Sequence, residues 1–67
     1  MFIEISGVEN LSVYYEIRTI LGFKAKQVVL ISGINKVNIK DLPSGIYYYT
    51  IFVNDTSKAS GKQIIIR

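Results

Sequence analysis

The chain consists of short runs of apolar residues that are separated by turn residues. Residues 2–5 form a brief apolar run that ends at Ser6-Gly7, and residues 11–20 alternate between the two faces expected of a strand. Because successive side chains of a strand point to opposite faces, this alternation predicts a strand. One face carries Leu11, Val13, Tyr15 and Ile17, and the other carries Ser12, Tyr14, Glu16 and Arg18. After a break at Gly22, residues 24–31 predict the returning strand.

The second half of the chain predicts three more strands and a sharp corner. Residues 32–35 are predicted as a turn because Gly and Asn tolerate positive φ, and residues 36–40 as a strand with Val37 and Ile39 inward. Residues 41–45 form the expected corner, and we expect a valine at Gly45 to unfold it. Residues 46–53 and 61–67 follow as strands, with a turn at 54–57 between them. About six strands with short connections predict an antiparallel sandwich or barrel.

Composition supports an all-β fold and one domain, residues 1–67. Ile and Val together number 18, against four Leu and two Ala, and β-branched residues favour strands. The chain has no His and no Cys, which excludes a Ser-His-Asp triad, a thiolate nucleophile and the usual zinc, haem and iron–sulfur sites. We therefore expect no enzyme activity and no cofactor.

Charge and the length of the apolar runs narrow the range of partners. The net charge of +3 is small, and the aromatic residues concentrate at residues 47–49 rather than over a basic face, so we expect no nucleic acid partner. No run approaches the roughly 18 apolar residues that span a membrane, so we expect no membrane insertion. The five carboxylates lie on different predicted elements or in turns, and each is expected on the solvated surface rather than in an acid–base pair.

The corner before residue 46 places Tyr47 near the start of a strand. This position resembles the tyrosine corner of immunoglobulin-like sandwiches, in which the ring packs inside and the hydroxyl bonds backbone across the turn. If Tyr47 points inward, then Ile46, Tyr48 and Phe52 point outward as an apolar row that would form an exposed contact patch. Either a loop or the neighbouring sheet covers this row, or an attached domain or a partner protein contacts it.

A set of ordered motifs extends from Gly22 to the last residue. It comprises a Gly-centred hairpin, Gly33-Ile34-Asn35, Val37-Asn38-Ile39, Leu42-Pro43-Ser44-Gly45-Ile46-Tyr47, and Lys62 before Ile64-Ile65-Ile66-Arg67. The order and spacing of these motifs, and their ending at the last residue, make the chain from about Leu11 onward resemble a known domain. That domain is the type A C-terminal sorting domain of type IX (Por) secretion substrates in Bacteroidetes. The chain departs from that pattern at Phe23, where a basic or polar residue commonly follows the hairpin glycine. It also lacks the Pro-Asn-Pro-like segment that usually precedes the first strand.

The resemblance implies a non-enzymatic domain that acts as an address. Its fold would be an immunoglobulin-like β-sandwich of about six to seven strands, excised here from a larger secreted precursor, with Met1 added for expression. Its partners would be the outer-membrane translocon, a sortase-like processing protease and an upstream cargo that is exported through the periplasm to the cell surface or the medium. The residues that match the motif, and that the resemblance assigns to partner recognition, are Gly33, Asn35, Leu42, Gly45, Tyr47, Lys62 and Arg67.

The residues also leave other functions open. A fibronectin-like or carbohydrate-binding accessory module of a secreted hydrolase is the main alternative, because Tyr14 and Tyr48 could stack on sugars. Residues 62–67 could dock on a partner by strand addition, although ordinary pairing with the strand of Tyr47 is the expected arrangement. Exposed strand edges would also allow a homodimer.

Overall fold

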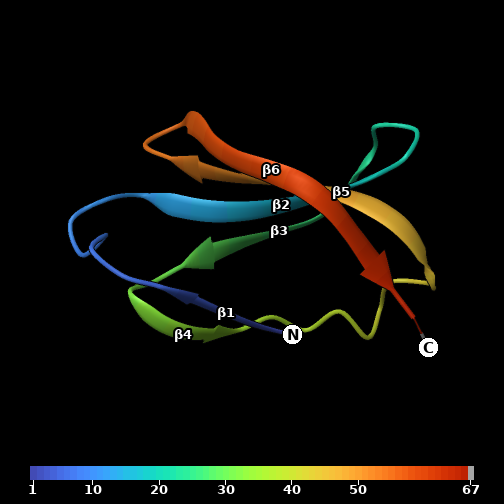
Figure 1. Ribbon diagram of the computed structural model, residues 1–67, viewed down its shortest axis with the longest axis horizontal. Helices are drawn as coiled ribbons and strands as arrows, with labels where there is room; N and C mark the ends of the chain where they lie inside the picture. Colours follow the sequence, from blue (N-terminus) through green and yellow to red (C-terminus); the bar gives the residue numbers. More distant parts are fainter. Residues whose placement is uncertain (67) are drawn as a thin grey trace.

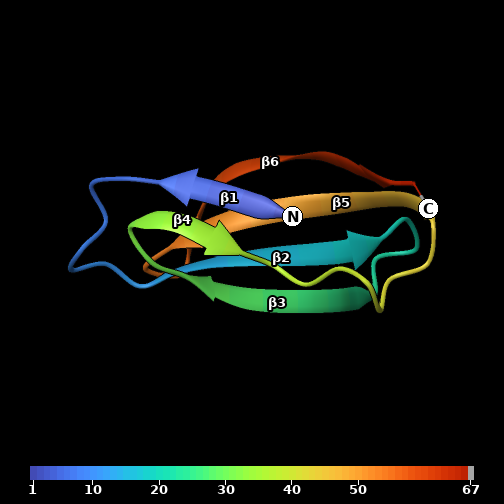
Figure 2. The same ribbon diagram turned by 90° about the horizontal axis from the view of Figure 1, so that it is seen from below.

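The computed structural model describes residues 1–66 as six strands in two antiparallel sheets, with no helix among them. The strands are β1 Phe2–Ile5, β2 Val13–Thr19, β3 Lys24–Leu30, β4 Gly33–Lys36, β5 Gly45–Val53 and β6 Thr56–Ile65. One sheet pairs β1 with β4, and the other has the order β3-β2-β5-β6. The small sheet lies over one face of the large one (Figures 1 and 2). The predicted all-β antiparallel sandwich is therefore confirmed.

The core fills the space between the two sheets and follows the predicted alternation of β2. Val13, Tyr15 and Ile17 are buried, and Ile17 is fully inaccessible to solvent. From the small sheet, Ile3 and Ile5 pack against this cluster. Leu11 does not belong to this inward face, because it precedes β2 and its side chain is exposed.

The segment around β4 differs from its prediction. Residues 33–36, expected largely as a turn, form the strand that pairs with β1, from Phe2↔Lys36 to Ile5↔Gly33. Residues 37–40, expected as a strand, have no regular structure. Gly33 explains the shift, because its φ of 105° completes the turn from β3 within one or two residues. Val37 is nevertheless buried as predicted.

The turn between β5 and β6 is shorter than predicted, and β6 begins earlier. Asn54 and Asp55 both have positive φ, 49° and 67°, which is the conformation of a two-residue type I′ hairpin turn. Thr56 pairs directly with Val53. Asn54 also ties this turn to the start of β2, because its Oδ1 accepts a hydrogen bond from the Ser12 N–H at 3.0 Å.

Candidate interaction surface

The predicted corner before β5 is present and is closed by Tyr47. The Tyr47 hydroxyl donates a hydrogen bond to the Pro43 carbonyl at 2.6 Å, and its ring is buried. Leu42 is also buried in the core cluster. The tyrosine corner is therefore confirmed as a structural feature. Gly45 is less critical to it than predicted, because its φ is not positive and an added Cβ would lie 3.8 Å from the ring of Tyr47, an ordinary contact distance.

Asn35 connects three segments of backbone through its buried side-chain amide. Its Oδ1 accepts from the Ile31 N–H at 2.8 Å, and its Nδ2 donates to the carbonyls of Ile31 at 2.8 Å and Ile3 at 3.2 Å. A further, longer bond reaches the Gly33 carbonyl. The amide thus holds the end of β3, the turn and β1 together, and every polar atom of the side chain has a partner. Such a satisfied buried polar network specifies the local geometry.

The motif-matched residues divide into buried and exposed sets. Asn35, Leu42 and Tyr47 are buried, so in the folded chain they act through the fold and offer little surface to a partner. Gly33, Gly45 and Lys62 are exposed. Arg67 lies outside the described residues. Of the residues assigned to partner recognition, Lys62 is thus the only described one that combines exposure with a long functional side chain.

The outward row of β5 is exposed only in part. Ile46 and Tyr48 are each about half exposed, at 48% and 50%. Phe52 is half-buried, because its ring stacks on Tyr14 with centroids 4.8 Å apart. Ile64, opposite Ile46 in the register, adds an exposed apolar side chain from β6. The exposed patch therefore consists of Ile46, Tyr48 and Ile64. The sequence analysis missed Ile64, which the alternation of inward and outward side chains along β6 could have identified.

A row of cations crosses the outer face of the large sheet next to this patch. Arg18 pairs in register with Lys24 on one side and with Tyr48 on the other, and Tyr48 pairs with Lys62. Within residues 1–66 Lys62 makes no ion pair, whereas the Lys24 ammonium donates to Gln27 Oε1 at 3.0 Å. We call Lys24, Arg18 and Lys62 the cation row. An anionic group could approach it from solvent.

Two carboxylates are paired with cations, and one of them is not on the surface as predicted. Glu16 is only 5% exposed, and its Oε1 accepts from Arg18 Nε at 2.5 Å. Glu16 lies between Gln27 of β3 and Thr50 of β5 in the register, and its burial shows that a surface position was the wrong prediction for it. Asp41 is exposed and accepts from Lys26 Nζ at 3.1 Å.

The interior of the sandwich contains one strongly perturbed phenol. Burial, followed by the neighbouring Tyr49, raises the pKa of Tyr15 to about 12. Its hydroxyl donates to Gln63 Oε1 at 3.0 Å, and its ring stacks on Tyr49 with centroids 5.4 Å apart. A phenol of such high pKa stays protonated at neutral pH, so this cluster stabilises the core and offers no base.

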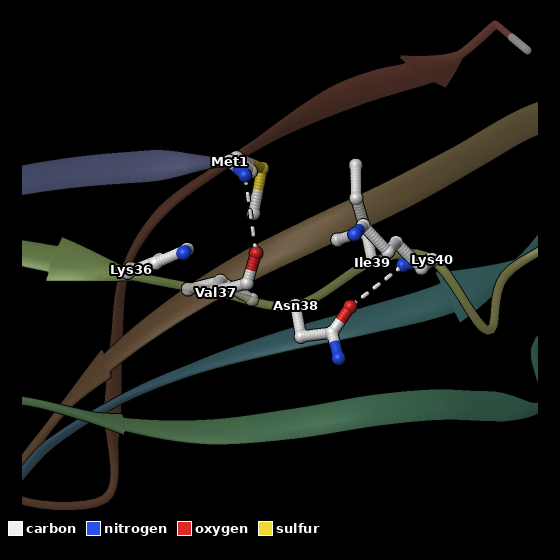
Figure 3. A pocket seen from close by; sticks show the side chains of 6 residues that line it. All are labelled: Met1, Lys36, Val37, Asn38, Ile39 and Lys40. Atoms are coloured by element: carbon white, nitrogen blue, oxygen red, sulfur yellow. Dashed lines mark hydrogen bonds between the residues drawn. The ribbon is translucent and has the colours of Figure 1, made fainter.

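A pocket of about 280 Å³ lies along the segment after β4 (Figure 3). Its lining consists of Met1 and residues 36–40. The Val37 carbonyl accepts from the Met1 amino nitrogen at 3.1 Å, and Asn38 Oδ1 accepts from the Lys40 N–H at 2.9 Å. This volume is just below the range typical of small-molecule sites. In the part of the chain described by the structure, no three His, Cys, Asp or Glu side chains gather as metal ligands.

Comparison of the chain with protein-family models, with curated proteins and with solved structures finds no match. Among residues 1–66 no helix is long and apolar enough to cross a membrane.

Proposed function

We propose that this chain is a non-enzymatic C-terminal sorting domain of immunoglobulin-like type that directs an upstream cargo through the type IX secretion system. The ordered set Gly33-x-Asn35, Leu42-x-x-Gly45-x-Tyr47 and Lys62 carries the proposal. Its support is that these dispersed residues occupy defined places in one small sandwich: Asn35 joins three backbone segments, and Tyr47 closes the corner before β5. The domain would reach the cell surface or the medium through the periplasm and the outer membrane.

The buried motif residues and the exposed patch have different tasks in this proposal. The buried residues Asn35, Leu42 and Tyr47 stabilise the fold. The exposed patch of Ile46, Tyr48 and Ile64, together with Lys62, contacts the translocon and the sortase-like protease. An aromatic ring beside a cation and two aliphatic side chains is typical of a contact surface, because aromatic residues contribute large apolar area at low entropic cost.

An export assay tests the proposal. Residues 1–67 are fused behind a periplasm-directed fluorescent reporter in a bacterium with a type IX system, and the reporter outside the cell is measured. We expect export of the unchanged fusion and reduced export of the variant Tyr48→Ser/Lys62→Ala. Val29→Ser is the matched control, because Val29 is exposed on the same outer face at the opposite end of the sheet. A folded domain whose reporter stays in the periplasm would contradict the proposed function.

The exposure of Tyr48 favours one alternative, a carbohydrate-binding accessory module. Sugars stack on exposed aromatic rings, and Tyr48 has Lys62 and Arg18 as cross-strand neighbours. Tyr14, the other predicted platform, is engaged with Phe52 and half-buried, which leaves one available ring. Retardation of the domain in gels containing polysaccharide, abolished by Tyr48→Ala, would support this alternative over the sorting function.

A further inference from the structure

The loop between β2 and β3 exposes three large apolar side chains. Ile20, Leu21 and Phe23 are 64%, 80% and 70% exposed. Backbone hydrogen bonds hold the loop closed: the Thr19 N–H donates to the Phe23 carbonyl at 2.8 Å, and the Gly22 N–H donates to the Thr19 carbonyl at 2.9 Å. The turn therefore keeps these side chains in water, away from the core. We call residues 20–23 the apolar loop.

More exposed apolar surface lies at the same end of the molecule. The register places Ile46 opposite Ile64, beyond the pair of Thr19 with Tyr47. Ile66 follows β6 and is also exposed. Figures 1 and 2 both show the apolar loop and the end of β6 at one end of the long axis. Figure 1 shows the loop and the end of β6 on different sides of the sheet at this end. The apolar loop by itself exposes three large apolar side chains, and such exposure indicates a contact site.

The charges of the two ends differ in sign. The cation row, Lys24, Arg18 and Lys62, crosses the outer face directly beside the apolar loop. Glu16 pairs with Arg18, so Lys24 and Lys62 are the members of the cation row that make no ion pair among residues 1–66. Glu4 belongs to β1, Glu9 to the segment that follows it and Asp55 to the β5–β6 turn, and Figure 1 shows that segment and that turn at the opposite end; Lys58, just after the turn, is the cation beside them.

We propose that this end of the domain docks on the surface of an anionic lipid bilayer. The apolar loop inserts its side chains at the boundary between headgroups and acyl chains, and the cation row contacts anionic headgroups. A lipid surface suits the shape of the site, because the apolar side chains project from a closed hairpin loop and do not line a groove. Apolar insertion and a basic patch together give stable peripheral binding where either alone is marginal.

This proposal goes beyond the sorting function and changes the expectation of no membrane insertion. That expectation rested on the absence of a long apolar run in the sequence, which concerns segments that span a bilayer. Peripheral docking needs only a few apolar side chains on a loop and cations beside them. The three side chains that would insert lie within residues 20–23, interrupted by Gly22 alone. A run of this length is too short to indicate a membrane segment in the sequence.

Sedimentation of the 67-residue chain with lipid vesicles tests the proposal. We expect partition onto vesicles of phosphatidylcholine mixed with phosphatidylserine to exceed that onto phosphatidylcholine alone by about tenfold or more, and to weaken with added salt. The variant Leu21→Ser/Phe23→Ser is expected to lower partition by about tenfold. Its matched control is Val29→Ser/Ile34→Ser, which removes equally exposed apolar side chains away from this end and is expected to bind normally.

Charge and depth of insertion are measured by two further sets of variants. Lys24→Glu/Lys62→Glu is expected to abolish the preference for phosphatidylserine, whereas Lys36→Glu/Lys58→Glu, with the same change in net charge, retains most of it. Because the chain has no Trp, a Phe23→Trp variant provides a single indole signal. We expect lipids with brominated acyl chains to quench it, and to leave the signal of a Val29→Trp variant unquenched.

Three results would overturn the proposal. Equal partition onto both kinds of vesicle would exclude recognition of anionic lipid. Equal binding by the apolar-loop variant and its control, with circular dichroism showing that both are folded, would exclude insertion of the loop. The third result combines two observations: the unchanged chain does not bind vesicles, and it forms a dimer in sedimentation velocity that Leu21→Ser/Phe23→Ser abolishes. This result would assign this end of the domain to contact with a second copy of the chain instead.

Discussion

Replacing Gly61 by alanine is expected to destabilise the domain through a clash with one aromatic ring. Gly61 lies opposite Tyr49 in the register of β5 and β6. A Cβ at Gly61 would lie 2.7 Å from Tyr49 Cε2 and 2.8 Å from its hydroxyl oxygen. The ring of Tyr49 has little freedom to move away, because it stacks on Tyr15, whose hydroxyl is bonded to Gln63.

The size of this effect follows from two opposing contributions. Forcing an extra methyl group into a packed site costs about 1–3 kcal/mol. Alanine in place of glycine also stiffens the unfolded chain, which offsets about 0.4–1 kcal/mol of that cost. The net loss in the free energy of unfolding is therefore about 1–2 kcal/mol. For a domain of this size the midpoint of thermal unfolding falls by roughly 5–15 °C.

Urea and thermal unfolding followed by circular dichroism measure this loss. Gly45→Ala is the matched control, because Gly45 lies in the same strand pair and a Cβ there meets the ring of Tyr47 at 3.8 Å. We expect Gly45→Ala to be neutral or to stabilise the domain by up to about 1 kcal/mol. The two variants make the same chemical change, so their difference isolates the contact with Tyr49.

A double-mutant cycle decides whether the ring of Tyr49 is the cause. In a Tyr49→Leu background, Gly61→Ala is expected to cost less than about 0.5 kcal/mol, because the clashing atoms are absent. If Gly61→Ala is as stable as the unchanged chain, or costs the same with and without the Tyr49 ring, the packing argument is refuted.

Three further predictions concern buried polar groups. Asn35→Asp places a carboxylate against the carbonyls of Ile31 and Ile3, so we expect a loss of about 2 kcal/mol or more at neutral pH in urea unfolding. That loss should shrink in mild acid, because a protonated carboxyl can donate again; a pH-independent loss would contradict this reason. Tyr47→Phe removes the bond to the Pro43 carbonyl and is expected to cost about 1 kcal/mol in the same assay, and unchanged stability would show that the bond contributes nothing. Because burial raises the pKa of Tyr15 from 10.0 to about 12, its contribution to stability is complete below pH 10 and is lost as pH rises toward 12. Tyr15→Phe should lack this alkaline loss and the tyrosinate step near pH 12 in an ultraviolet absorbance titration.

The parts of the fold that the sequence predicted well are those where the signal is local. Alternation identified β2 and the residues that share each of its faces, and the long β-branched and aromatic stretch identified β5. The corner was recognisable because Pro43 and Gly45 precede Tyr47 at a characteristic spacing, and the hydrogen bond from Tyr47 to Pro43 confirms it. Each of these signals involves residues within a few positions of one another.

The candidate site was predicted less completely, because exposure depends on neighbours from other strands. Phe52 was expected in the exposed patch, but Tyr14 of β2 stacks on it. That contact requires β2 and β5 to be adjacent, although β3 and β4 separate them in the chain. Glu16 was expected on the surface but is buried. Its burial also depends on neighbours from other strands, because it lies in the middle of a four-stranded sheet.

The amino-acid sequence by itself determined the class of fold, the division of β2 and β5 into two faces and the corner that Tyr47 closes. Only the tertiary structure decided the strand order β3-β2-β5-β6, the short pairing of β1 with β4, and the gathering of the apolar loop and the cation row at one end. The physical reason is that side-chain alternation and turn chemistry act between near neighbours. Sheet order and register depend instead on packing between segments that lie far apart in the chain.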